Sequence, residues 1–182
     1  MEKWKILEEK DVFKTRVFTI KNLHCYHPGK EVRHGFYILE TPDWINVVAL
    51  TEAGEFIFVK QHRMGTDEHT LETPAGLIEE GEDPLEAAGR ELLEETGYEA
   101  GTIRLMKRLS ANPAIMNNHI HFFCATGCRK TKNQKLDQAE DIEVHLFSPV
   151  EVLRMMDSGE INHSVIITAL CLYLKENPPV IG

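Results

Sequence analysis

Three glutamates near the middle of the chain have the spacing that gathers carboxylates on one side of a helix. Glu91, Glu94 and Glu95 stand at positions i, i+3 and i+4, and residues so spaced share one helical face. Like charges on such a face repel by roughly 0.2–0.5 kcal/mol per pair, and a bound cation would relieve that repulsion. Oxygen ligands favour a hard ion, Mg²⁺ or Mn²⁺, over zinc. The alternative interpretation is a solvated acidic surface.

The acidic charge is local to this part of the sequence. Residues 64–103 contain twelve acidic side chains and one basic side chain, Arg90, whereas the whole chain carries a net charge of −9. The rest of the chain is therefore slightly basic, and the acidity is not a general device for solubility. One arginine among so many carboxylates also predicts specific ion pairs, for which Glu82 and Glu94 are the expected partners.

The intervals between these residues match a known motif, the Nudix box. Its seven fixed residue types are all present, as Gly76, Glu82, Arg90, Glu91, Glu94, Glu95 and Gly97. Leu92 and Tyr98 fill its bulky apolar positions. The chain therefore resembles the Nudix hydrolase family over nearly its whole length. The resemblance implies an α/β protein, a single Nudix domain of residues 1–182 built as an α/β/α sandwich with a mixed sheet, with a β-rich segment at 1–40 and the box at 76–98.

The resemblance also assigns roles to the box residues. Mg²⁺ or Mn²⁺ is expected to bind Glu91, Glu95 and Glu94 together with the backbone carbonyl of Ala75, and Glu94 is a candidate for either a second metal or catalysis. The remaining fixed residues are expected to support this arrangement. Arg90 and Glu82 would brace the loop and helix, Gly76 would allow a sharp turn, and Gly97 would end the helix.

Three features favour a nucleoside diphosphate sugar as substrate. Pro113 lies sixteen positions after Gly97, where a proline is typical of the ADP-ribose pyrophosphatase branch. The entry to the box, from Leu71 to Glu79, resembles that branch, and Glu72 within it is expected to support the metal or a phosphate-bound water. Arg63 ends an expected strand and resembles an arginine that contacts the substrate diphosphate, for which its planar fork is suited.

One departure keeps the sugar open. The branch pattern favours glycine after the proline, whereas this chain has Ala114, so GDP-mannose and other sugar nucleotides remain candidates beside ADP-ribose. A dinucleoside polyphosphate and coenzyme A are the alternative substrates. A non-catalytic Nudix binding module is the third interpretation, although such a module would be expected to lose box carboxylates and none is missing.

The group that accepts the proton from water is expected on a loop beyond the box. The resemblance points to Glu140, just before a strand, with Glu143 and a box glutamate as competitors. Tyr26, Phe36 and Tyr37 are candidates for stacking on the base, although strand packing is the alternative for Phe36 and Tyr37. The number of metal ions and the preferred base stay open at this level.

Composition narrows the cellular compartment and the partners expected for this protein. The chain has no apolar run near the ~20 residues that span a bilayer, and its first residues have no apolar signal-peptide core. The four cysteines lack zinc spacing, and Cys124 and Cys128 are expected to be free buried thiols, so we expect a cytoplasmic protein. Net acidity argues against nucleic acid as a partner. The resemblance implies a homodimer, with the N-terminal strands as the candidate interface.

The pattern of apolar residues predicts strands, one helix, further strands and two final helices. A helix is expected from the Asp83-Pro84 pair to Gly97, with Leu85, Ala88, Leu92 and Leu93 as its apolar stripe, and residues 64–69 are expected to be a loop. Strands are predicted at 12–20, 32–39, 45–50, 55–61, 102–109, 119–125 and 142–147, with 45–50 and 55–61 forming a hairpin. Further helices are predicted from the Ser148 cap to Gly159 and at 164–175.

Overall fold

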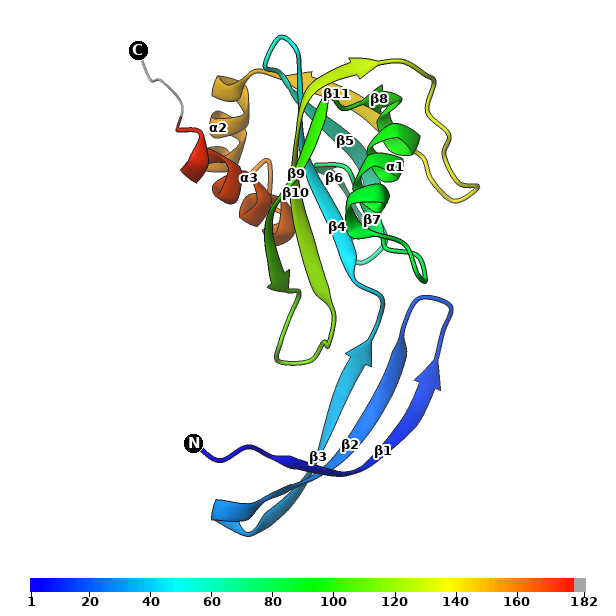
Figure 1. Ribbon diagram of the computed structural model, residues 1–182, viewed down its shortest axis with the longest axis vertical. Coiled ribbons are helices and arrows are strands. Elements are labelled where there is room, and N and C mark those ends of the chain that lie inside the picture. Colours follow the sequence, from blue (N-terminus) through cyan, green and yellow to red (C-terminus); the bar gives the residue numbers. More distant parts are fainter. Residues whose placement is uncertain (179–182) are drawn as a thin grey trace. The chain divides into compact units, whose positions relative to one another are not determined.

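The computed structural model describes residues 1–178 and contains eleven strands and three α-helices among them (Figure 1). In chain order the elements are β1 (Lys5–Lys14), β2 (Thr19–His27), a 3₁₀ turn (Pro28–Lys30), β3 (Val32–Glu40), β4 (Trp44–Thr51), β5 (Phe56–Arg63), β6 (Glu68–Glu72), β7 (Ala75–Leu77), α1 (Pro84–Thr96), β8 (Tyr98–Glu99), β9 (Thr102–Ser110), β10 (His119–Lys130), β11 (Glu143–Phe147), α2 (Pro149–Ser158) and α3 (Ser164–Glu176).

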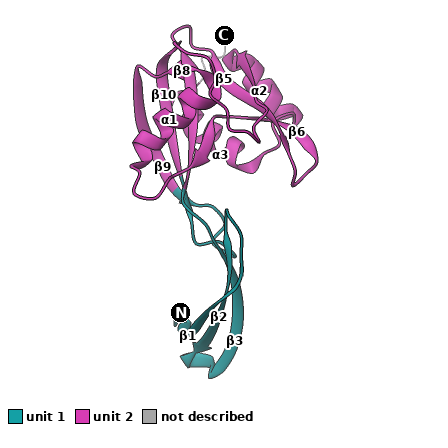
Figure 2. Ribbon diagram, turned by 90° about the vertical axis from the view of Figure 1, so that its right-hand side faces the viewer, with its two compact units in different colours: residues 1–43, 109–120 teal, residues 44–108, 121–182 magenta. Residues whose placement is uncertain are grey.

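The chain divides into two compact units, coloured separately in Figure 2. The first comprises residues 1–43 and 109–120, and the second comprises residues 44–108 and 121–182. The second unit contains the whole box, so it is the one that positions the predicted chemistry.

The first unit is built on an antiparallel sheet in the order β1-β2-β3. One predicted strand, residues 12–20, is wrong, because a turn separates β1 from β2 there. The side chain of Thr15 makes that turn: its Oγ1 accepts hydrogen bonds from the N–H groups of Val17 and Phe18 and donates to the carbonyl of Phe18. Such a local side-chain bond competes with strand pairing, and alternating apolar residues do not reveal it.

The second unit holds the larger sheet, whose main path runs β11-β5-β4-β10-β8. The predicted hairpin is confirmed as antiparallel β4 and β5. The predicted loop at residues 64–69 is too long, because strand β6 begins at Glu68 and pairs with β5. Asp67, with φ 56°, allows that tight reversal, and the short strand β7 pairs with β4.

Both faces of β4 and β5 are covered, which explains their continuous apolar runs. Side chains alternate between the faces of a strand. Val47 and Ala49 of β4 therefore belong to the cluster that includes Ala88 and Leu92 of α1. On β5, the ring of Phe56 meets Tyr173 of α3 at 5.3 Å. Figure 1 shows α1 on one side of the sheet and α2 and α3 on the other, so the predicted α/β/α sandwich is confirmed.

The limits of α1 follow the predicted signals. The Asp83 carboxylate accepts a hydrogen bond from the Leu85 N–H, Pro84 is the first helical residue, and Gly97 ends the helix with φ 76°. One member of the predicted stripe is wrong, because Leu85 is exposed while Ala87 takes a buried place. The apolar face is rotated toward Ala87, Leu92 and Glu95, so that a carboxylate lies on the buried side of the helix.

The two later helices also begin and end as predicted. Ser148 and Glu151 form a reciprocal capping box at the start of α2, and Gly159 ends it. Helix α3 begins after His163, whose Nδ1 accepts the Val165 N–H. Among residues 1–178, no helix is long and apolar enough to cross a membrane. Cys124 and Cys128 are free and buried, as expected.

Candidate active site

The box brings strand β7 against helix α1, and Gly76 makes this approach possible. A Cβ added to Gly76 would lie 2.1 Å from Cδ and Oε1 of Glu91, so any side chain would displace that carboxylate. Gly76 is the middle residue of β7 and does not form a turn. The sequence-based reason for this glycine was therefore wrong: it is required by the close approach of Glu91 and not by a sharp turn.

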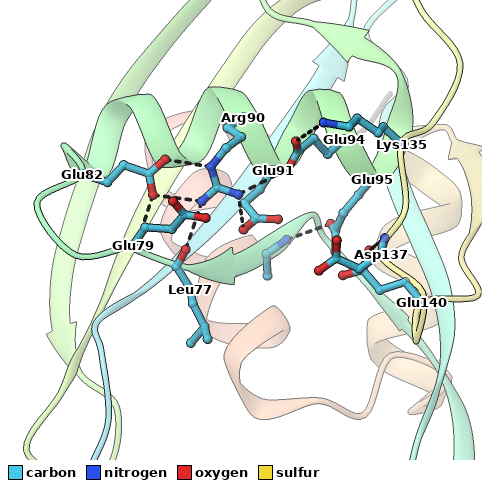
Figure 3. Close-up of polar contacts among 11 residues, drawn as sticks. Leu77, Glu79, Glu82, Arg90, Glu91, Glu94, Glu95, Lys135, Asp137 and Glu140 are labelled. Atoms are coloured by element: carbon cyan, nitrogen blue, oxygen red, sulfur yellow. Dashed lines mark hydrogen bonds and ion pairs between the residues drawn. The ribbon is translucent and has the colours of Figure 1, made fainter. Parts of the chain in front are cut away.

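Arg90 is the centre of an ion-pair network that ties the box loop to α1 (Figure 3). Its Nε and Nη2 donate to the two oxygens of Glu82 at 2.7 and 2.9 Å. Its Nη1 donates to Glu91 at 2.8 Å and to Glu94 at 3.3 Å, and Nη2 also reaches the Leu77 carbonyl. The expected pairing of Arg90 with Glu82 and Glu94 is present, and because the guanidinium is planar and rigid its donors hold these groups in defined directions.

Glu95 is a buried carboxyl group with a raised pKa. It is 3% exposed, and its Oε2 accepts a hydrogen bond from the Ala75 N–H at 3.1 Å. Burial raises the pKa of Glu95 to about 8. The Ala75 bond and Arg63 oppose this rise, whereas the charges of Glu91 and Glu140 add to it. A carboxyl group is thus held in the interior with too little positive charge around it.

The chemistry of these side chains fits a divalent cation. Burial also raises the pKa of Glu91; Arg90 opposes that rise and Glu94 and Glu140 increase it. Two oxygen ligands one helical turn apart, both destabilised as anions, are suited to a hard cation. Within residues 1–178, no three Asp, Glu, His or Cys side chains already surround one metal position. The donors are therefore gathered but not preassembled, with Glu91 held by Arg90.

Glu94, the third predicted ligand, has two cationic neighbours. One of its oxygens accepts from Arg90, and the other is 3.9 Å from Nζ of Lys135. In Figure 3 its side chain extends toward Lys135, while Glu95 extends toward Glu140. Glu91 and Glu94 therefore accept from the same nitrogen of Arg90, and Glu94 is also close to Lys135.

Glu140 lies on the connection between β10 and β11, residues 131–142, which we call the Glu140 loop. Its charge raises the pKa of both Glu91 and Glu95, so its carboxylate lies within electrostatic reach of both. The competitor Glu143 is the first residue of β11, where it is exposed and lies 3.2 Å from Nε2 of His145. Of the two, the geometry favours Glu140 as a partner of the box.

Arg63 and Glu72 form a two-pronged ion pair on the neighbouring strands β5 and β6. Arg63 donates through Nε at 2.7 Å and Nη2 at 2.6 Å, and the Thr70 hydroxyl donates to the same carboxylate at 2.6 Å. Burial alone would raise the pKa of Glu72, but these hydrogen bonds and His163 outweigh it and lower that pKa. Glu72 is 1% exposed, and its two oxygens hold the Arg63 guanidinium in one orientation.

The remaining predicted residues belong to the other unit. Pro113 lies in the connection between β9 and β10, within residues 109–120. Phe36 packs edge-on against Trp4 at 5.0 Å and against His34 at 4.7 Å, so the strand-packing alternative describes it. Tyr37 is exposed.

Two residues that shape the site were not predicted from the sequence. The Thr70 hydroxyl donates to Glu72, and the Gln134 carboxamide donates to the backbone carbonyls of Glu95 in α1 and of Ile142 at the end of the Glu140 loop. Thr70 lay outside the box and is beside a position expected to be loop. Gln134 lies in a polar stretch where nothing in the pattern distinguishes it from its neighbours, because its partners are backbone atoms, one of them 39 residues earlier in the chain.

The sequence and the fold of this chain are similar to those of known proteins. A model of the family described as NUDIX domain matches residues 41–170. An ADP-ribose pyrophosphatase of Bacillus subtilis is 32% identical, over 94% of this chain and 96% of that protein. A methanol dehydrogenase activator of Bacillus methanolicus is 29% identical with the same coverage. A crystal structure of an ADP compounds hydrolase superposes with a TM-score of 0.86 at 24% identity, covering 99% of this chain and 98% of that one, and shows the same fold.

Proposed function

Because the chain belongs to the Nudix family, we propose that it is a Mg²⁺- or Mn²⁺-dependent hydrolase that cleaves the diphosphate linkage of nucleoside diphosphate sugars. The resemblance found in the box and the predicted fold are confirmed. The products are a nucleoside monophosphate and a sugar phosphate. The relative from Bacillus subtilis supports ADP-ribose as the first substrate to test.

The observation that carries this proposal is the buried Glu95 carboxyl group beside Glu91. A side chain that is 3% exposed, with its pKa raised to about 8, destabilises a protein unless the site gains positive charge. A solvated acidic surface, the alternative interpretation, does not bury its carboxylates. When bound, a divalent cation neutralises phosphoryl oxygens and lowers the pKa of its water.

The residues of the chain account for the other requirements of the reaction. Glu91 and Glu95 would hold the cation, and the Ala75 carbonyl on β7 would be a further oxygen donor. Water attacks a phosphorus atom, its oxygen forms the new P–O bond, and the bridging P–O bond breaks with its electrons leaving on the departing phosphate. The water proton passes to the carboxylate of Glu140, which lies within electrostatic reach of both ligands.

Arg63 is suited to hold the diphosphate before cleavage. Its side chain is 43% exposed although the side chain of its partner Glu72 is only 2% exposed, so the guanidinium is anchored on one edge and open to solvent elsewhere. An arginine fixed in this way loses little conformational entropy when it binds phosphate oxygens. Glu72 thus acts on substrate through Arg63 in this proposal, and Pro113 remains a candidate for the sugar side.

A substrate panel tests the proposal directly. Purified protein with Mg²⁺ or Mn²⁺ is incubated with ADP-ribose, GDP-mannose, UDP-glucose, diadenosine polyphosphates and coenzyme A, and products are separated by ion-exchange chromatography. We expect cleavage of at least one sugar nucleotide to a nucleoside monophosphate. Cleavage of only dinucleoside polyphosphates or coenzyme A would replace the substrate class. Tight binding without cleavage in either metal would favour the non-catalytic module.

We also propose that two copies associate through the first unit. Strand β1 is the edge of its sheet and is exposed along its length, with four large apolar side chains in solvent, Ile6, Leu7, Val12 and Phe13. An exposed edge of this kind invites pairing with another chain. The four free cysteines support a reducing, cytoplasmic setting.

A further inference from the structure

The Glu140 loop is attached to the end of the helix that carries the box carboxylates. The last carbonyls of any α-helix lack partners inside the helix, and α1 has no basic residue in its last turn. Here the loop supplies donors: the Lys135 N–H reaches the Glu94 carbonyl at 2.9 Å, and the N–H groups of Thr131 and Lys132 reach the Gly97 carbonyl at 3.0 and 3.2 Å. The first part of the loop therefore caps α1.

One side chain joins this cap to the far end of the loop. The carboxamide Nε2 of Gln134 donates to the Glu95 carbonyl at 2.6 Å and to the Ile142 carbonyl at 3.0 Å. An amide nitrogen has two hydrogens, so both of its donors are used. Ile142 is 6% exposed and fixes the end of the loop in the core. Gln134 is half-buried, whereas most of the loop around it is exposed.

Glu140 lies inside the short ring that this side chain closes. Between Gln134 and Ile142 the chain makes one turn, in which the Glu140 N–H donates to the Asp137 carbonyl at 3.0 Å and the Asp137 N–H donates to Glu140 Oε2 at 2.8 Å. These two bonds are local and do not connect the turn to α1. Two groups join this turn to the helix with Glu91 and Glu95: the backbone N–H of Lys135 on its near side, and the side chain of Gln134, which also holds its far side through Ile142.

We propose that Gln134 is a positioning residue that fastens both ends of the Glu140 loop to the C-terminus of α1 and so holds Glu140 opposite the box carboxylates. This inference rests on the proposed function for the role of Glu140, but the fastening itself is a property of the loop. Replacing the carboxamide leaves the backbone cap from Thr131 to Lys135 in place. The segment 136–142 then loses the side-chain bonds that join its far end to the helix, while α1 keeps most of its cap.

The fastening is tested without substrate by hydrogen exchange of the whole protein. Gln134→Met keeps the length of the side chain and removes both donors, and Gln138→Met, at an exposed position of the same loop, is the matched control. We expect amides in 136–142 to exchange roughly tenfold faster or more in Gln134→Met, with the middle of α1 unchanged. Unchanged exchange in this segment would overturn the inference, whether or not the protein cleaves any substrate.

The positioning role is tested by a double-mutant cycle with Glu140→Gln on the substrate found in the panel. We expect Gln134→Met to lower kcat by about 10–100-fold with little change in KM, and to have almost no effect when Glu140→Gln is already present. An equal loss in both backgrounds would mean that Gln134 acts on the fold in general and would overturn the proposal. Gln134→Ala, compared by thermal melting, provides a second variant if Gln134→Met does not fold.

Discussion

Replacing Glu95 by Gln separates the metal role of this residue from its effect on stability. In the metal-free protein, the folded-state pKa of about 8 lies above the ordinary 4.5 of a glutamate. The folded state therefore keeps a proton that the unfolded state releases between these values. It follows that this group stabilises the fold fully below pH 4.5, and that its contribution is lost as pH rises toward 8.

The size of the effect follows from the shift. One pKa unit corresponds to 1.36 kcal/mol, so the full shift sets an upper limit of about 5 kcal/mol. Between pH 5 and pH 8 we expect the free energy of unfolding to fall by about 2–3 kcal/mol through this group, since water entry relaxes part of the burial penalty. Gln keeps an oxygen for the Ala75 N–H and has no charge, so Glu95→Gln should lose much less stability over the same range. Glu91 titrates in both proteins, and the loss of its repulsion with Glu95 is part of the difference between them.

The assay is urea unfolding in EDTA at several pH values, repeated with Mg²⁺. At pH 8 in EDTA, we expect the free energy of unfolding of Glu95→Gln to exceed that of the unaltered protein by about 2–3 kcal/mol. Mg²⁺ should stabilise only the unaltered protein. Glu86→Gln, at an exposed position in the first turn of the same helix, is the matched control and should change little.

Activity gives the second measurement on the same variant. Turnover in Glu95→Gln should fall by about three orders of magnitude or more, since the charge that holds the cation is lost. If the free energy of unfolding of both proteins in EDTA changed equally with pH, burial would not be what raises the pKa of Glu95. Near-normal turnover would refute the assignment of Glu95 as a metal ligand.

Three other changes test separate parts of the site and fold. Gly76→Ala should displace the Glu91 carboxylate, lowering Mg²⁺ affinity in calorimetry by about 10–100-fold while the melting temperature changes little, because the tip of a flexible side chain is what must move. Glu72→Gln should lower the free energy of unfolding in urea at pH 7 by about 1–3 kcal/mol, which is less than for a fully buried pair because Arg63 is partly exposed. The same variant should raise KM. An unchanged KM would contradict the action of Glu72 through Arg63. Phe13→Glu should shift the mass found by light scattering from two copies to one, and a monomeric unaltered protein would exclude the proposed dimer.

Much of the site was predictable from sequence because its interactions are local. Asp83, Pro84 and Gly97 act on backbone groups within a few residues, so they set the limits of α1 in any context. Arg90 lies eight residues after Glu82 and four before Glu94, and one loop and one helical turn are enough to bring them together. The family motif and the fold followed from the same short intervals.

Other features depended on residues far apart in the sequence. Glu72 is a residue type that can bind a metal, so the sequence suggested that role. Only the antiparallel pairing of β5 with β6 brings its carboxylate to the guanidinium of Arg63. The need for glycine at position 76 was predictable, but its cause was not, because the cause is a carboxylate fifteen residues later on another element.

The sequence by itself determined which residues of this protein can do chemistry, since helical periodicity and capping operate over one or two turns. Only the tertiary structure decided which of them are buried and which meet. The raised pKa of Glu95 requires a sheet that excludes water from one face of α1, and the place of Glu140 requires a loop capping that helix from 40 residues farther along the chain. Burial and long-range contact arise from packing of the whole chain, so no local pattern encodes them.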